Sequence, residues 1–247
     1  MKKELRRQIK QDELVTGVQR ASQWTSAHGS ELKITLAVVA VIALVAFGVM
    51  TYQGHRQAEA ERAFSTALDT FHAPVSTEQP EGFEPPPGPL FPSAAEKYRK
   101  AARELDDVVQ RFGSLDVGRR ARYYAALSRI ELGEYDPAEK ALTELAAHRS
   151  DALESSLARL ALADLHRRRG QLDKAIEDYR HLVDDTSFAL PRDHALLELA
   201  ATLETAKRAT EAGAAYRRLA DEFPNSVYAP EARRRADHLT GGTSAQG

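Results

Sequence analysis

Hydrophobic and polar positions alternate with the spacing of helix faces over most of the C-terminal part of the chain. Four alanines stand 37 residues apart, and a larger apolar residue follows each of them four and seven positions later. The alanines are Ala101, Ala138, Ala175 and Ala212, and their followers are Leu105 and Val108, Leu142 and Leu145, Tyr179 and Leu182, and Tyr216 and Leu219. Because positions i, i+4 and i+7 share one face of an α-helix, the pattern predicts four helices that bury equivalent faces.

The residues around each alanine predict a helical hairpin. Gly133 and Gly170 precede their alanines by five positions, where a turn between two helices needs positive φ. Asp136 is the expected N-cap of the helix that contains Ala138, with Pro137 at the first helical position and Glu139 completing a capping box, and Ser93 with Glu96 forms the same box. Further apolar helical patterns precede each turn. We therefore expect an all-α solenoid, in which stacked hairpins bury a core that one pair alone cannot form.

One apolar stretch precedes the repeats. Residues 34–54 are 21 consecutive residues without a formal charge. As a helix they span roughly 32 Å, close to the ~30 Å hydrocarbon core of a bilayer. This predicts a single N-terminal transmembrane helix; the alternatives are a buried core helix or a cleaved signal peptide. No convincing cleavage site follows the stretch, which disfavours the latter.

Flanking charge predicts the orientation of this span. Seven basic residues precede it, and only Arg56 and Arg62 fall within the next twenty. By the positive-inside rule the N-terminus is cytoplasmic, and the C-terminal part is exported, to the periplasmic side of the inner membrane in a bacterium. The basic residues of the leader are a topology signal or, alternatively, contacts for anionic lipid.

The expected organisation has four parts. Residues 1–33 form a basic cytoplasmic leader, 34–54 the transmembrane helix, 55–239 the solenoid and 240–247 a flexible tail. Residues 73–92 form a Pro-rich loop that displaces a helix at 55–71 from its partner in the first hairpin. The loop is read as a solvated insertion or as a ligand for a partner protein.

Composition and motifs point away from catalysis. The formal net charge is −2, which gives no basic field for nucleic acid, and there are no cysteines. The eight histidines form no zinc-binding spacing, and phosphate-loop, dinucleotide and nucleophile-elbow motifs are missing from the sequence. His166 is expected to be a satisfied interior histidine, and His181 with Asp184 and Asp185 a solvated helix end. We expect no enzyme, no cofactor and no metal.

A helix, a glycine turn and a second helix with an alanine anchor resemble the tetratricopeptide repeat (TPR). The period of 37 departs from the usual 34, Lys207 replaces the turn glycine of the last unit, and only that unit keeps a helix-end proline, Pro224. The order of leader, span and solenoid resembles the bacterial TPR-like inner-membrane family of the ancillary Sec translocon subunit (YfgM-like). That resemblance implies association with Sec translocon components, periplasmic chaperones or exported clients.

In TPR domains the first helix of each hairpin lines an inner groove. The resemblance therefore implies a protein-binding groove, and the repeat register assigns to it Tyr123, Leu127, Ile130, Asp164, Arg167, Arg168, Ala201 and Glu204. The lysine and asparagine that clamp a C-terminal carboxylate in some TPR proteins are replaced here, at Tyr123, Leu127, Leu160 and Asp164. Such a groove suits an apolar or amphipathic segment.

The expected function is a membrane-anchored scaffold for protein–protein interactions at the periplasmic face of the inner membrane. Two alternatives remain open on the sequence. The first is a scaffold for cell-envelope assembly or an export complex, which would share the same architecture. The second is an enzyme with a cryptic site.

Overall fold

The computed structural model describes residues 29–76, 88–148 and 152–241, and within them the regular structure is helical apart from one isolated bridge. The chain divides into two compact units, residues 1–58 and 59–247. Residues 1–28 of the leader, residues 77–87 of the Pro-rich loop and the last six residues lie outside the described ranges. The helices are α2 (Gly29–His72), α3 (Ala94–Phe112), α4 (Asp116–Glu131), α5 (Tyr135–Ala146), α6 (Ala152–Arg168), α7 (Leu172–Asp184), α8 (Arg192–Thr205), α9 (Ala209–Glu222) and α10 (Ala229–Gly241).

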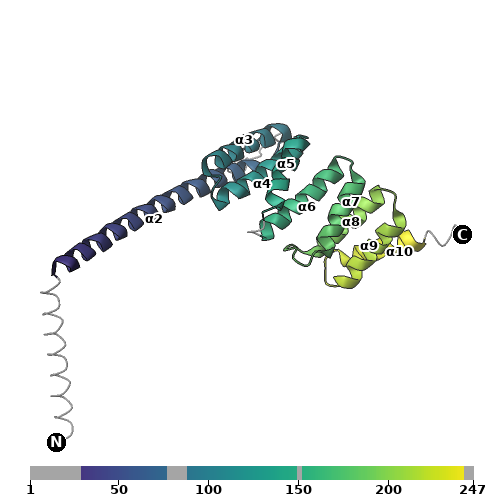
Figure 1. The fold of residues 1–247 in the computed structure, drawn as a ribbon. Helices are drawn as coiled ribbons and strands as arrows, with labels where there is room; N and C mark the ends of the chain where they lie inside the picture. The colour runs from purple at the N-terminus through teal and green to yellow at the C-terminus, as the bar shows by residue number, and fades with distance from the viewer. Residues whose placement is uncertain (1–28, 77–87, 149–151, 242–247) are drawn as a thin grey trace, which may run out of the picture. The chain divides into compact units, whose positions relative to one another are not determined.

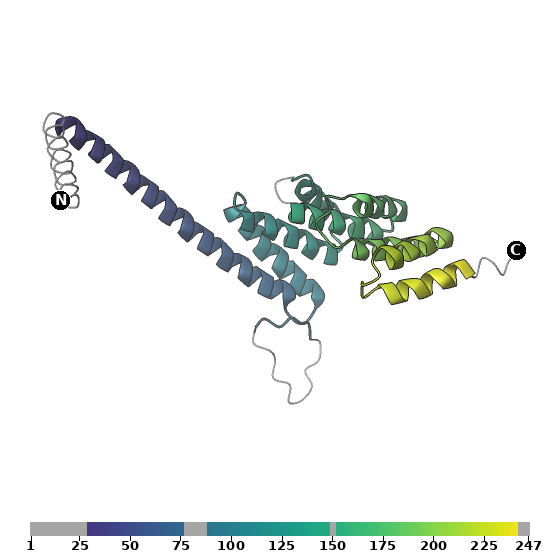
Figure 2. The same cartoon turned by 90° about the horizontal axis from the view of Figure 1, so that it is seen from below.

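Residues 59–247 form a stack of helical hairpins in sequence order (Figures 1 and 2). The C-terminal part of α2 with α4, α6 and α8 are the first helices, and α3, α5, α7 and α9 are the second helices. Each second helix packs against the first helix of the next hairpin, and α10 covers α9 at the end. The all-α, TPR-like solenoid that the sequence predicts is therefore confirmed.

The four repeated alanines lie at the closest contacts of this stack. Ala101, Ala138, Ala175 and Ala212 are each 0% exposed, and the larger residues four and seven positions later are at most 4% exposed. Burial of a Leu or Val side chain contributes about 1.5–3 kcal/mol. In every hairpin the 37-residue pattern thus supplies an alanine at the helix contact and larger apolar side chains that fill the core beside it.

The hairpin turns share one backbone geometry. Gly133 and Gly170 adopt φ of 76° and 75°, and Lys207 adopts φ of 59° at the equivalent position of the last hairpin. The next N–H group in each turn donates to a carbonyl five residues earlier, at 2.9 Å in all three cases. Lys207 therefore keeps the glycine turn, although a side chain makes the left-handed conformation less favourable.

The helix starts correct one expectation. Asp136 is not the N-cap of its helix: α5 begins at Tyr135, and the preceding Glu134 makes no side-chain capping bond. The turn at Gly133 sets this start early, so Asp136 and Pro137 both lie in the first turn, where a missing N–H costs little. The predicted N-cap at Ser93 is confirmed, because its Oγ accepts from the Glu96 N–H at 3.2 Å.

The first hairpin closes around the Pro-rich insertion. Ala60, Phe64 and Ala67 of α2 are buried in the same cluster as Leu105 and Val108 of α3. The expected pairing of the helix at 55–71 with the first alanine helix is therefore confirmed for residues 60–67. Beyond α2, the Ser76 N–H donates to the Phe91 carbonyl at 3.0 Å, and the Phe91 N–H donates to the Pro74 carbonyl at 3.3 Å. These bonds tie the two ends of the insertion together.

The N-terminal part of α2 is long and apolar enough to cross a membrane, and it is the one such candidate among the described residues. Its large apolar side chains between Ile34 and Tyr52 are 49–75% exposed. No core cluster among the described residues includes them.

We expect Ala175→Leu to destabilise the repeat unit by ~1–3 kcal/mol, because the added side chain has no space between α7 and its neighbours. Urea titration of the detergent-solubilised full chain, followed by circular dichroism, measures this. The matched control is Glu177→Leu, an exposed position of the same helix. Lys174 is less suitable because it pairs at 2.9 Å with Glu139 of α5, whereas the ion pair of Glu177 is longer, 3.8 Å, and lies within its own helix, with His181. Equal midpoints for the two variants would contradict the assigned packing face.

Candidate protein-binding surface

Ion pairs join each first helix to the next and mark out one continuous surface, here called the first-helix face. The side chains that form it come from α2, α4, α6, α8 and α10. The pairs are Glu61–Arg120 at 2.6 Å, Glu131–Arg168 at 2.8 Å, Arg167–Glu198 at 3.8 Å and Glu204–Arg235 at 3.0 Å. The first-helix face therefore carries side chains from every hairpin of the described unit.

On α4, the face offers aromatic and aliphatic surface. Tyr123 and Leu127 are half-buried and pack against the core cluster of the second and third hairpins. The ring of Tyr123 lies edge-on to Tyr124, with centroids 5.4 Å apart, and burial raises the pKa of Tyr123 to about 12. Ile130 is only 5% exposed and belongs to the core. Of the three α4 residues assigned to the groove, two therefore retain accessible surface.

On α6, the assigned residues form a charge network. Asp164 accepts from both Arg167 and Arg168, the latter at 2.7 Å. Arg168 also reaches Glu131 of α4, and Arg167 reaches toward Glu198 of α8. The structure therefore brings Asp164, Arg167 and Arg168 together, and it pairs both arginines within the chain.

A tyrosine of the second helix lies beneath this network. Arg167 is within hydrogen-bonding reach of the Tyr179 hydroxyl, and Tyr179 is 1% exposed. Burial, followed by the charges of Asp164 and Glu198, raises the pKa of Tyr179 above its usual range. The repeated tyrosine position thus supports the first-helix face from below.

The last hairpin repeats this arrangement. Ala201 and Glu204 of α8 are half-buried, and Glu204 pairs with Arg235 while lying within reach of the Tyr216 hydroxyl. Burial is the largest cause of the raised pKa of Tyr216, and Glu204 is the next. Tyr216 follows Tyr179 by 37 residues, so one structural motif recurs in consecutive hairpins.

Five residues of these ion pairs were not predicted for the groove from the sequence. They are Glu61, Arg120, Glu131, Glu198 and Arg235. A signal for two of them was present, because Arg167–Glu198 and Glu204–Arg235 both span 31 residues and occupy equivalent positions with opposite signs. A separation of 31 does not match the 37-residue period, so the repeat pattern alone does not predict these pairs.

Charge on the first-helix face is nearly balanced. The network contains five carboxylates and four arginines, and each of the four arginines is paired. Paired charges beside exposed apolar surface favour a ligand with an apolar stripe and flanking polar groups over a single terminal carboxylate. This geometry suits the binding of an amphipathic polypeptide segment.

The histidines have structural surroundings. His166 is 4% exposed and lies between Asp178 and Glu139, with its Nε2 3.2 Å from Glu139, so it joins the second and third hairpins. This agrees with the expected interior histidine. His181 is exposed beside Glu177. Within the described part of the chain, histidines and carboxylates form no group that could hold a metal ion.

Two family models match this chain. Residues 23–194 match the family model of the tetratricopeptide repeat-like domain, and residues 194–226 match that of the tetratricopeptide repeat. No curated protein matches the chain. A similar solved structure contains nearly identical TPR-like repeats of a Podosopora anserina protein described as a kinesin light chain; it is 15% identical, covers 61% of this chain and 81% of its own, and has a TM-score of 0.49. The first family match takes in the apolar stretch of α2 and more than half of the residues, so the chain belongs to the tetratricopeptide repeat-like domain family.

Proposed function

We propose that this chain is a membrane-anchored scaffold that holds protein partners at the periplasmic face of the inner membrane. The observation that carries the proposal is helix α2, which contains an exposed apolar segment and continues as the first helix of the repeat unit. One helix therefore supplies the anchor and the first element of the binding unit. TPR repeats are typical of protein–protein interaction scaffolds, which supports the binding role.

The exposed side chains of α2 support the anchor. Apolar residues from Ile34 to Tyr52 would face water in a soluble protein, and burying each large one is favourable by ~1.5–3 kcal/mol. The uncharged segment 34–54 is about as long as the hydrocarbon core is thick. A lipid environment removes this surface from water all round the helix, whereas one partner helix would cover a single side.

The first-helix face is the proposed binding surface. We assign partner contacts to Tyr123, Leu127, Arg168, Ala201 and Glu204, which combine apolar area with paired charge. Asp164 and Arg167 hold that arrangement in place through their contacts with each other and with Tyr179. An amphipathic segment of a partner would place its apolar stripe on Tyr123 and Leu127.

The partners we propose are components of the Sec translocon, periplasmic chaperones or their exported clients. Support comes from the order of basic leader, apolar span and 37-residue repeats, the order that resembles the inner-membrane family described above. A scaffold anchored at this membrane would lie where exported chains emerge. A scaffold for envelope assembly would present the same surface to different proteins, so identification of the partners separates the two functions.

We expect alkaline phosphatase fused after Gly247 to be active in a bacterial host and the same enzyme fused after Ser30 to be inactive. The excess of basic residues before the span, against Arg56 and Arg62 after it, is the physical reason. Enzyme activity in intact cells, normalised to fusion protein in the membrane fraction, measures the topology. The reverse pattern would exclude the periplasmic location.

We expect a variant combining Tyr123→Ala, Leu127→Ala and Arg168→Glu to lose crosslinks to translocon components or chaperones by about tenfold, which corresponds to ~1.4 kcal/mol. The changes remove apolar contact area and reverse one exposed charge. Arg167 is left intact because it contacts Tyr179 in the core. Quantitative mass spectrometry after crosslinking in intact cells is the measurement.

The matched control combines Lys140→Glu and Glu177→Lys, both exposed on second helices. Circular dichroism must show that the variant and the control are folded. Undiminished crosslinks in the folded variant would exclude the first-helix face as the binding surface. Loss of crosslinks to envelope-assembly proteins instead of translocon proteins would support the alternative function.

A further inference from the structure

The first hairpin has a side that no helix covers within the described residues. At every later step of the stack, a second helix packs on the next first helix: α3 on α4, α5 on α6, α7 on α8, and α9 on α10. For α2 and α3 the described part of residues 59–247 contains no preceding second helix. Comparison with the equivalent helix of a later hairpin, α9, shows what kind of element packs on such a side.

Helix α9 makes contacts on two sides. On one side it meets α10: a Cβ at Gly213 would lie 3.2 Å from Thr240, and Arg217 donates to the Thr240 hydroxyl at 3.2 Å. On the other side it meets α7, through ion pairs of Glu211 with Arg180 and of Arg218 with Asp184. The two sides of a second helix therefore face the following hairpin and the preceding one.

The equivalent positions of α3 lie 111 residues earlier, three repeat periods. Asp106, equivalent to Arg217, pairs with Arg129 of α4, so the side that faces the following hairpin is occupied. Lys100 and Asp107 are equivalent to Glu211 and Arg218. These two residues occupy the side that would face a preceding hairpin.

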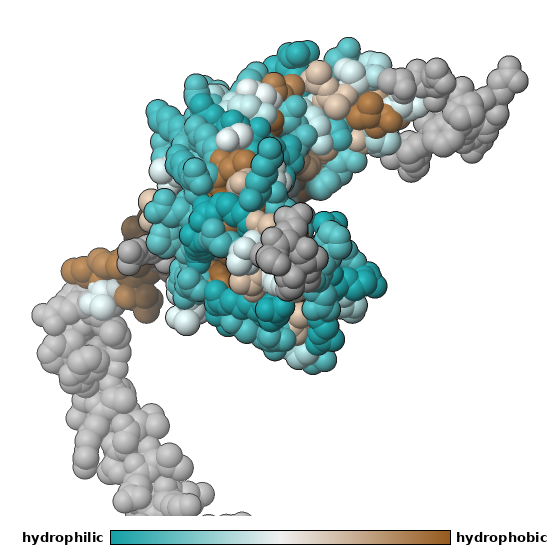
Figure 3. Space-filling view, turned by 90° about the vertical axis from the view of Figure 1, so that its right-hand side faces the viewer, coloured by the Kyte–Doolittle hydropathy of each residue, from teal (hydrophilic) through white to brown (hydrophobic). Residues whose placement is uncertain are grey.

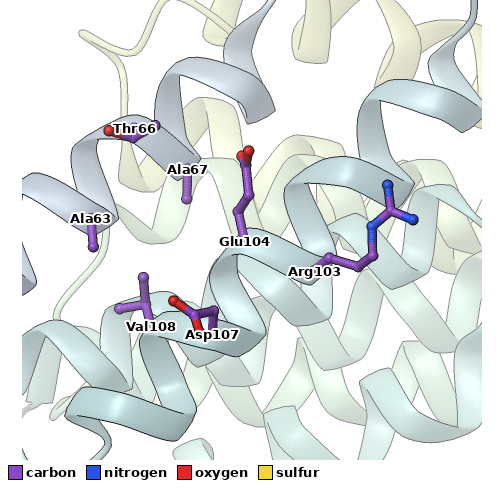
Figure 4. Close-up of a pocket in the computed structure, with 7 residues that line it drawn as sticks. All are labelled: Ala63, Thr66, Ala67, Arg103, Glu104, Asp107 and Val108. Carbon is purple, nitrogen blue, oxygen red and sulfur yellow. The ribbon is translucent and has the colours of Figure 1, made fainter.

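A hollow of about 400 Å³ lies on that uncovered side, between α2 and α3 (Figure 4). Its walls include small side chains of α2 and charged side chains of α3: Ala63, Thr66, Ala67, Arg103, Glu104 and Asp107. In α9 the equivalents of the last three, Ala214, Ala215 and Arg218, line a hollow of about 320 Å³ that α7 helps to enclose through Arg180 and Asp184. Among the described residues, the hollow between α2 and α3 has no helix in the place that α7 takes beside the hollow at α9.

Glu104 adds an electrostatic reason for a partner. Its carboxylate lies beside Ala67 (Figure 4), and its Oε2 is shielded from solvent but accepts no hydrogen bond from the residues that the structure describes. Its Oε1 is 3.6 Å from the Lys100 ammonium. A shielded carboxylate oxygen without a donor is unfavourable, so a basic group from outside the chain would be stabilising here.

The C-terminal end of the stack is closed by helix α10. The outward side chains of α10 are charged and exposed, among them Glu231, Arg234 and Asp237. The side of the molecule at the right of Figure 1, where α10 lies, is mostly hydrophilic (Figure 3). A polar terminal helix is the usual way to end a solenoid. The C-terminal end of the stack is thus closed by a polar helix, whereas the first hairpin carries an open hollow that a partner could occupy.

We propose that this hollow docks an amphipathic helix of a partner protein in the way that α8 and α9 receive α7. The charges of α7 specify which helix fits. Arg180 faces Glu211 and Asp184 faces Arg218, but the equivalents in α3, Lys100 and Asp107, have the opposite signs. The partner helix therefore carries an acid against Lys100 and, four residues later, a base against Asp107 and Glu104. This site is separate from the first-helix face.

The probe is a stapled peptide of residues 172–185 with Arg180→Glu and Asp184→Lys, and the control is the same peptide with its natural charges. Fluorescence anisotropy against the full chain in lipid nanodiscs measures affinity. We expect the charge-inverted peptide to bind about tenfold more tightly, because two repulsive contacts become attractive. In the full chain carrying Lys100→Glu and Asp107→Arg, the preference should reverse.

A steric variant tests the hollow itself. Ala63→Leu should fill it and abolish peptide binding, whereas Ser65→Leu, at an exposed position of the same helix, should leave binding unchanged. Equal binding of the two peptides, binding of neither, or binding that survives Ala63→Leu would overturn the proposal. A dimer of the chain that Ala63→Leu dissociates while neither peptide binds would assign the hollow to a second copy and equally overturn it.

Discussion

Close approach of helices at four buried alanines is the contact on which the rest of this fold depends. Because Ala101, Ala138, Ala175 and Ala212 present only a methyl group, the neighbouring helices come near enough for the larger residues one and two turns later to fill the core. The same contact recurs every 37 residues, so each hairpin reproduces the placement of the one before. The first-helix face and the tyrosines beneath it follow from that repetition.

Most of the backbone could be predicted from the sequence, because backbone geometry is encoded locally. The alanine period, the turns at Gly133 and Gly170 and the N-cap at Ser93 were each visible as sequence patterns, and the structure confirms them. Lys207 shows the limit of such patterns: the surrounding helices hold it in the left-handed conformation that glycine would favour. Asp136 shows another, since the helix starts two residues earlier than the sequence predicts, directly after the turn at Gly133.

The binding surface was less predictable, because it depends on side chains from different hairpins. Glu198 and Arg235 share a separation of 31 residues from Arg167 and Glu204 in the sequence, but the stacking of the hairpins identifies them as partners. Ile130 has the helical spacing of a surface residue, yet the following hairpin buries it. The uncovered side of α3 required the same three-dimensional comparison. Both proposed surfaces are therefore properties of the stack, with paired charge along one face and an open hollow at one end.

The most direct test of the scaffold function is site-specific photo-crosslinking of the full chain in native membranes. A photoreactive phenylalanine analogue replaces Tyr123 on the first-helix face or, as a control, Glu177 on the exposed side of α7. The account predicts discrete protein adducts from position 123, identified by mass spectrometry as translocon or chaperone proteins, and few or none from position 177. Adducts from position 177 alone, or equal adducts from both, would contradict it.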